Sequence, residues 1–166
     1  MPEQSDVTDE EVVPGGSGST GRTAGRDHRL VVGMDGSPQS LAALDWVANL
    51  AEATGASVEV LASWEWPTNF GATLVVSSDY DPHADAEALV GGAVRDARAR
   101  HPSVSFVPLV ARGRPATMLV EASAGADLLA VGSRGHGEVS GALIGSVAEH
   151  CAAHAHCPVL VIRGGR

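Results

Sequence analysis

A glycine-rich loop between an apolar run and a helical segment is the part of this sequence best suited to binding a phosphate group. The run covers 128–131, and the helical segment begins near Gly145-Ser146. Glycines let a backbone approach a ligand closely and turn its N–H groups inward. A helix start adds unpaired N–H donors and the positive end of the helix dipole. Residues 128–147 therefore predict an anion site; the alternative is a glycine-rich surface loop that binds nothing.

The spacing of the glycines favours the first interpretation. Gly132 and Gly135 are separated by two residues, and nine more separate Gly135 from Gly145-Ser146. This spacing, with a hydroxyl residue at its end, resembles the nucleotide-binding motif of the universal stress protein family. The stretches 31–37, 55–64 and 157–162 resemble the first, second and last strands of that family. The resemblance covers residues 29–163.

Alternating strands and helices must position this loop. Apolar runs predict five strands, at 30–34, 58–63, 103–110, 128–131 and 158–162. Helical spacing predicts four helices, at 38–54, 84–99, 115–123 and 145–155, with Trp46 expected in the core. The alternation predicts a parallel sheet covered on both faces, a three-layer α/β/α sandwich of strand order 3-2-1-4-5. The resemblance implies the adenine nucleotide alpha hydrolase-like version of this fold.

Two segments far apart in the sequence should meet at the edge of this sheet. Ligands bind such sheets at the carboxyl ends of the strands, where the winding reverses. With this strand order the reversal lies between the strands that end at Asp35 and Gly132. Asp35 could accept hydrogen bonds from a ribose diol there; alternatively, it is a carboxylate that the helix dipole favours at a helix start.

The resemblance implies ATP as the ligand, with or without Mg²⁺, and assigns a role to each site residue. Gly33 and Met34 would line the nucleoside, Asp35 would bind the ribose, and the backbone of Ser63 would meet the adenine. The phosphate loop and the helix start that follows it would consist of Gly132, Ser133, Arg134, Gly135, His136, Gly145, Ser146 and Val147.

Length and composition set the outer limits of the interpretation. The 166 residues suit one domain, 29–166, preceded by an acidic, glycine- and serine-rich stretch, 1–28, that predicts a disordered tail. A net charge of −9 argues against a nucleic-acid partner, which needs a basic face. All eleven basic residues are arginines, which excludes the lysine-dependent Walker loop and Schiff-base enzymes.

The expected location is the cytoplasm. Two cysteines, Cys151 and Cys157, are too few for a disulfide framework and suit a reducing compartment. No apolar run is long enough to span a bilayer, and the acidic N-terminus has no signal-peptide core, so no membrane partner is expected.

The sequence predicts neither a catalytic residue nor a metal site. His136 lies between glycines, as histidines do in nucleotidyltransferases, but those motifs follow the first strand and this one follows the fourth. His150 and His154 share a helix face, yet no further cluster of ligands completes a metal site. His150 and His154 are therefore interpreted as part of a surface or interface cluster.

The predicted function is that of an ATP-binding stress-response sensor or regulatory module. The family commonly forms homodimers through its last strand, and the apolar run 158–162 suits such a contact. One alternative is a weak ATPase or an autophosphorylating enzyme with Ser146 or another hydroxyl as acceptor. Another is a flavodoxin-like electron carrier, which would be yellow.

Overall fold

The computed structural model describes residues 28–66, 68–69, 72–73, 80–135 and 144–163. The predicted tail, 1–28, lies outside these ranges except for His28. The predicted site residue His136 lies outside them too.

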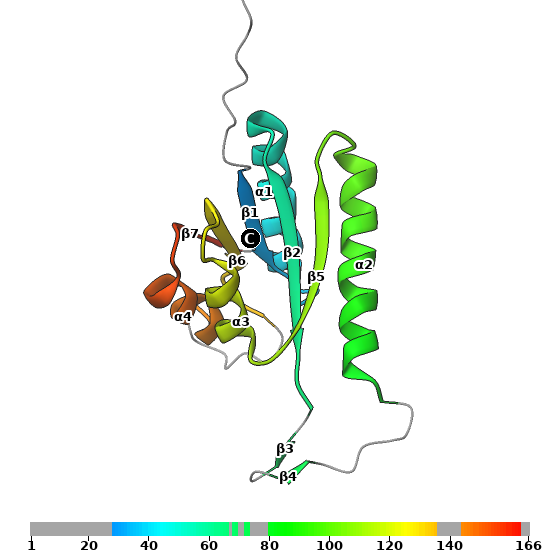
Figure 1. Cartoon of the computed structure of the whole chain (residues 1–166), viewed down its shortest axis with the longest axis vertical. Helices are drawn as coiled ribbons and strands as arrows, with labels where there is room; N and C mark the ends of the chain where they lie inside the picture. The colour runs from blue at the N-terminus through cyan, green and yellow to red at the C-terminus, as the bar shows by residue number, and fades with distance from the viewer. Residues whose placement is uncertain (1–27, 67, 70–71, 74–79, 136–143, 164–166) are drawn as a thin grey trace, which may run out of the picture.

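Within these ranges the chain forms eleven elements, drawn in Figure 1. They are β1 (Arg29–Gly33), α1 (Pro38–Thr54), β2 (Ser57–Trp64), β3 (Thr68–Asn69), β4 (Ala72–Thr73), α2 (Pro82–Arg100), β5 (Phe106–Arg112), α3 (Pro115–Ala122), β6 (Leu128–Gly132), α4 (Ser146–His154) and β7 (Val159–Ile162).

Five of the strands form one parallel sheet in the order β5-β2-β1-β6-β7. This confirms the predicted order 3-2-1-4-5. The antiparallel pair β3 and β4, which was not predicted, lies beyond the carboxyl end of β2 (Figure 1). None of the helices within the described ranges is both long and apolar enough to cross a bilayer.

The first two helices begin at residues whose side chains cap them. Ser37 Oγ accepts a hydrogen bond from Ser40 N at 3.2 Å, and Pro38 occupies the first turn of α1. Asp81 caps α2 by accepting from the amides of His83 and Ala84 at 3.0 and 3.1 Å. This cap starts α2 at Pro82, two residues before the predicted start at 84.

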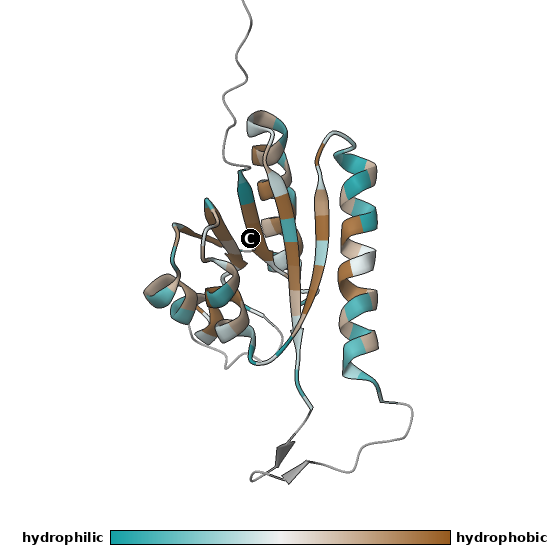
Figure 2. Cartoon of the chain, viewed as in Figure 1, coloured by the Kyte–Doolittle hydropathy of each residue, from teal (hydrophilic) through white to brown (hydrophobic). Residues whose placement is uncertain are grey.

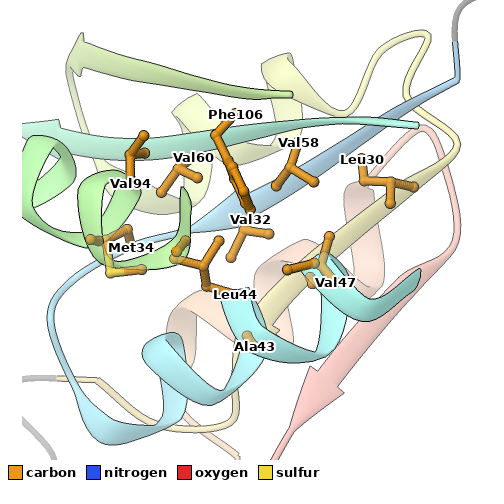
Figure 3. Close-up of a cluster of buried hydrophobic side chains, with 14 of the residues drawn as sticks. Leu30, Val32, Met34, Ala43, Leu44, Val47, Val58, Val60, Val94 and Phe106 are labelled. Atoms are coloured by element: carbon orange, nitrogen blue, oxygen red, sulfur yellow. The ribbon is translucent and has the colours of Figure 1, made fainter. Parts of the chain in front are cut away.

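Two clusters of buried side chains hold the layers together, because neighbouring residues of a strand face opposite sides of the sheet. The larger cluster lies between the sheet and helices α1 and α2 and includes Val32, Leu44 and Phe106 (Figure 3). The smaller cluster lies against α3 and α4 and includes Val31 and Leu129. Figure 2 shows the matching distribution, with apolar strands inside and polar residues on the outer side of α2.

The expectation that Trp46 belongs to the core is wrong, since this side chain is 47% exposed. The neighbouring positions Ala43, Val47 and Ala51 take the contacts with the sheet and are fully or almost fully buried. Trp46 falls on the flank of α1, so helical spacing alone misplaced it.

The two edges of the sheet differ in what they offer to a further strand. On β5, Arg98 Nη2 donates to the carbonyl oxygen of Phe106 at 2.7 Å, and Pro108 has no N–H to donate. On β7, the carbonyls of Pro158 and Ile162 accept from the neighbouring chain segment, at 3.0 and 2.7 Å. The backbone groups of Val159 and Val161 therefore point outward along an apolar, half-buried strand.

Candidate functional site

A cavity of about 640 Å³ lies where the winding of the sheet reverses, at the carboxyl ends of β1 and β6. Every predicted site residue within the described ranges lines it. These residues are Gly33, Met34, Asp35, Ser63, Gly132, Ser133, Arg134, Gly135, Gly145, Ser146 and Val147. The fold thus brings together residues at the carboxyl ends of β1, β2 and β6 and at the start of α4.

Asp35 follows the end of β1, where it both bonds the start of α1 and lies at the cavity. Its Oδ1 accepts a hydrogen bond from Ser37 N at 2.9 Å, which helps to turn the chain into α1. The residue is exposed and also lines the cavity. The helix-start contact therefore exists, and it leaves the carboxylate at the wall of the site.

Two glycines of the loop are needed because other atoms stand where their side chains would be. A Cβ on Gly132 would come within 2.8 Å of Gln39 Cβ, so this glycine lets β6 end against the first turn of α1. A Cβ on Gly135 would overlap Asp35 Oδ2. Gly135 therefore lies directly against the Asp35 carboxylate, and a larger residue at 135 would force the two apart.

The base of the loop is closed by backbone hydrogen bonds. Gly145 N donates to the carbonyl oxygen of Ser133 at 2.7 Å, and Ser133 N donates to the carbonyl oxygen of Ile162 at 2.7 Å. Ser133 is buried and joins the loop to β7 on one side and to the start of α4 on the other. These contacts fix the position of the α4 N-terminus relative to the sheet.

The N-terminus of α4 has no side-chain cap. Its N-cap is Gly145, and the first amide bonded within the helix is that of Glu149, which donates to the Gly145 carbonyl at 3.0 Å. Among the described residues, nothing accepts from the amides of Ser146, Val147 and Ala148. Such a helix start attracts an anion through its open donors and the helix dipole.

Sequence reasoning missed several residues that line the cavity. The additional lining residues are Ser40, Leu61, Pro115, Leu119, Val131, Ile144, Ala148 and Glu149. Glu149 could have been found, since it stands three residues after Ser146 in the first turn of a helix that was predicted. Leu119 gave no such signal, because its place depends on how closely α3 packs on β1: a Cβ on Gly33 would lie 3.0 Å from Leu119 Cδ1.

Beside the cavity, aromatic rings surround the end of β2. Trp64, which follows the lining residue Ser63, packs edge to face against Trp66 at 6.1 Å and against His83 at 5.5 Å between ring centroids. Arg112 Cζ lies over the Trp64 ring at 5.5 Å. The guanidinium of Arg112 is therefore held on this ring and does not line the cavity.

The histidines of α4 and the two cysteines, of which Cys157 follows that helix, do not line the cavity. The rings of His150 and His154 are 4.4 Å apart and exposed, and no group of three or more metal-ligating side chains occurs among the described residues. Burial raises the pKa of Cys151 to about 11, and burial also raises the pKa of Cys157. Both thiols therefore stay protonated at neutral pH.

Comparisons with known proteins agree on one family. A model described as the universal stress protein family matches residues 28–163. Universal stress protein Rv2623 of Mycobacterium tuberculosis is 34% identical over 140 residues, which are 81% of this chain and 44% of that protein. A universal stress protein of Mycolicibacterium smegmatis is 32% identical over 143 residues, 84% of this chain and 48% of its own length. The chain spans about half the length of the curated relatives it matches.

Solved structures show the same fold. A universal stress protein in complex with cAMP superposes with a TM-score of 0.63 and 28% identity, covering 85% of this chain and all of that chain. Universal stress protein UspA from Lactobacillus plantarum gives a TM-score of 0.63 at 20% identity, covering 84% of this chain and 99% of its own. The second likeness supports the fold alone.

Proposed function

Because this chain belongs to the universal stress protein family, we propose that its cavity binds an adenine nucleotide. The observation that carries the proposal is the uncapped start of α4, which lines the same cavity as the Asp35 carboxylate. One arrangement suits a phosphate and the other a ribose, and the fold holds them in one cavity. The related structure with cAMP contains a ligand of the same class.

In this proposal each part of the nucleotide meets a different element. Asp35 accepts hydrogen bonds from the ribose hydroxyls beside Gly33 and Met34, and the backbone at Ser63 meets the adenine. The glycine loop, His136 included, surrounds the phosphates together with the Ser146 hydroxyl and the α4 amides. The apolar walls at Leu61 and Leu119 suit a base, since ligand sites combine apolar lining with a few polar groups.

The proposed ligand is ATP, with or without Mg²⁺, and the proposed role is that of a sensor or regulatory module in a stress response. The cavity volume of about 640 Å³ falls inside the range, roughly 300–1,000 Å³, that is usual for small-molecule sites. A partner protein would distinguish the nucleotide-bound form of the protein from the free form. The proposed location is the cytoplasm, where adenine nucleotides are made.

A second candidate function is slow ATP hydrolysis or autophosphorylation. The observation that favours it is the exposed Ser146 hydroxyl at the cavity wall, beside the amides proposed to hold the phosphates. Release of inorganic phosphate, or incorporation of labelled phosphate that Ser146→Ala abolishes, would support this function. A nucleotide recovered unchanged after prolonged incubation would favour binding alone.

We also propose a homodimer through β7. This strand presents the outward backbone groups of Val159 and Val161 along an apolar segment, whereas the β5 edge offers neither the Pro108 donor nor a free Phe106 acceptor. A second copy of β7 would satisfy those groups. The stretch 1–28 is proposed to lie outside the folded domain, 29–166, except for His28, whose carbonyl accepts from Ser57 N.

Calorimetric titration tests the proposed function. We expect ATP to bind at least about tenfold more tightly than GTP, since the base is read by backbone groups at Ser63. Mass spectrometry of the small molecules that copurify with the protein would identify the ligand independently. Absence of binding by any adenine nucleotide would contradict the proposal.

A further inference from the structure

The charged side chains that line the cavity have an unexpected balance. Among the described residues they are Asp35, Arg134 and Glu149, two carboxylates and one guanidinium. The chain contains no lysine to add a second cation. The described part of a site proposed for a phosphate ligand therefore has a net negative side-chain charge.

Among the described residues, Glu149 is the carboxylate nearest in sequence to the proposed phosphate contacts at Ser146 and Val147. It stands in the first turn of α4, three residues after Ser146. Its own amide is bonded to the Gly145 carbonyl, while its side chain is exposed. No hydrogen bond or ion pair joins the Glu149 carboxylate to any described residue, so no neighbour there neutralises it.

Nearby arginines do not restore the balance. Arg112 lies over the Trp64 ring, and neither Arg112 nor Arg114 lines the cavity. The helix dipole of α4 contributes only about half a positive charge at its N-terminus. That is enough to favour one phosphate, but not to offset a triphosphate that faces a carboxylate in the same turn.

We propose that Glu149 makes this site select nucleotides by phosphate charge. A nucleotide with a single phosphate binds without a divalent cation, whereas ATP binds well only after Mg²⁺ has lowered its charge. This inference rests on the proposed adenine nucleotide site. It adds a specificity-determining residue that acts by repulsion, which is a common means of discrimination between related ligands.

The physical reason is the difference in charge between the ligands. A single terminal phosphate carries about two negative charges near neutral pH, and a cyclic phosphate carries one. Free ATP carries about four, and its outer phosphates would stand closest to the α4 turn. Bound Mg²⁺ removes about two of these charges, so the repulsion from Glu149 then falls most for the triphosphate.

A structural role for Glu149 predicts a different result. A carboxylate in the first turn of a helix also interacts favourably with the helix dipole. Its loss would lower the thermal midpoint, but would not change the ratio between ATP affinities measured with and without Mg²⁺. That ratio is therefore the informative quantity.

The experiment is calorimetric titration of AMP, cAMP and ATP, each with excess Mg²⁺ and with EDTA. The proteins are the parent, Glu149→Gln, Glu149→Arg and the control Asp96→Asn. Asp96 is an exposed residue of α2, on the other face of the sheet, and its replacement changes the net charge by the same amount as Glu149→Gln. Thermal unfolding of each variant verifies that it folds.

We expect EDTA to weaken ATP binding to the parent and to Asp96→Asn by about a hundredfold. In Glu149→Gln, EDTA should weaken ATP binding by only about tenfold, that is, about ten times less than in the parent. In Glu149→Arg the loss of ATP affinity in EDTA should be smaller still. AMP and cAMP should respond to EDTA by less than about threefold in every protein.

Two results would overturn the inference in distinguishable ways. If Glu149→Gln and Glu149→Arg keep the parent's Mg²⁺ dependence while nucleotides still bind, the site exists and Glu149 does not select among ligands. If no adenine nucleotide binds to the parent under either condition, the proposed site itself is wrong.

Discussion

The helices on the two faces of the sheet begin in different ways. On one face, α1 and α2 start at Ser37 and Asp81, whose side chains bond the first free amides. On the other face, α3 and α4 start at Arg114 and Gly145 without a side-chain cap. The uncapped pair begins at the cavity, which Pro115 and Ser146 both line.

The packing follows the same division. The cluster under α1 and α2 contains most of the fully buried side chains, whereas the cluster under α3 and α4 is smaller; partly buried residues border both. A capped helix start contributes about 1 kcal/mol of stability, which the second face forgoes. The difference indicates that one face stabilises the fold and the other leaves its polar groups open for a ligand.

The largest expected effect separates the two cores. Leu44→Ala, under α1, should lower the free energy of unfolding by about 2–5 kcal/mol because it leaves a cavity in the larger cluster. ATP affinity should stay within about twofold of the parent. Leu119→Ala, under α3, should lower stability and also weaken ATP, because Leu119 lines the cavity. Urea unfolding and calorimetry measure both quantities; equal losses of affinity in the two variants would contradict the division.

Gly135→Val tests the loop on the open face. Its side chain would meet Asp35 Oδ2, so the loop must move away from the carboxylate. We expect ATP affinity to fall by about a hundredfold or more, while the exposed position keeps the thermal midpoint nearly unchanged. Gly91→Val on α2, where a Cβ meets no atom within 4 Å, is a control that should not affect ATP. If Gly135→Val binds ATP as tightly as the parent, the loop does not take part in nucleotide binding.

Asp35→Ala should have the next largest effect on binding. A hydrogen bond to a charged group contributes on the order of 1.5–3 kcal/mol, so the loss should be about ten- to a hundredfold. Because Asp35 Oδ1 also accepts from Ser37 N, a small decrease in stability should accompany it. If the variant binds ATP like the parent, that helix-start contact is the whole role of the carboxylate.

Two serines, one at a helix start on each face of the sheet, allow a direct comparison of stability with ATP affinity. Ser37→Ala removes the α1 cap and should lower the free energy of unfolding by about 1 kcal/mol without changing ATP affinity. Ser146→Ala, at the uncapped start of α4, should leave stability within about 0.5 kcal/mol and weaken ATP severalfold. Chemical denaturation and titration of both variants would expose any reversal of this pattern.

The smallest effect is expected from the N-terminal stretch. Deleting residues 1–27 keeps His28, whose carbonyl accepts from Ser57 N at 2.9 Å. The composition of this stretch predicts a thermal midpoint within about 2 °C of the parent and unchanged ATP affinity. A larger decrease in a calorimetric scan would mean that the stretch packs against one of the two faces.

The sequence predicted the sheet well because each of its strands is a short apolar run with turn residues at its ends. It was less accurate where tertiary contacts decide. The strand β5 begins at Phe106 and not at 103, since the turn after α2, where Val104 N donates to the His101 carbonyl, takes up the intervening residues. Trp46 was misplaced because helical spacing gives a face but not the width of the stripe that the sheet covers.

The candidate site was partly predictable for a similar reason. Backbone features, such as the glycines and the helix start at Gly145, leave marks in the sequence that spacing can reveal. The walls formed by Leu119 and Ile144 depend on how closely α3 and the loop approach the sheet, which no local pattern records. The cap at Ser37 was predictable too, because Pro38 follows it at the first helical position.

The β5 edge restricts how many further strands the sheet can add. With the Phe106 carbonyl occupied by Arg98 and no N–H at Pro108, a further strand would find no free acceptor at Phe106 and no donor at Pro108. A sheet that extends preferentially at its other edge, β7, adds a single partner strand there. Two copies joined through β7 would have β5 at both outer edges, where the missing acceptor and donor disfavour growth into a fibre.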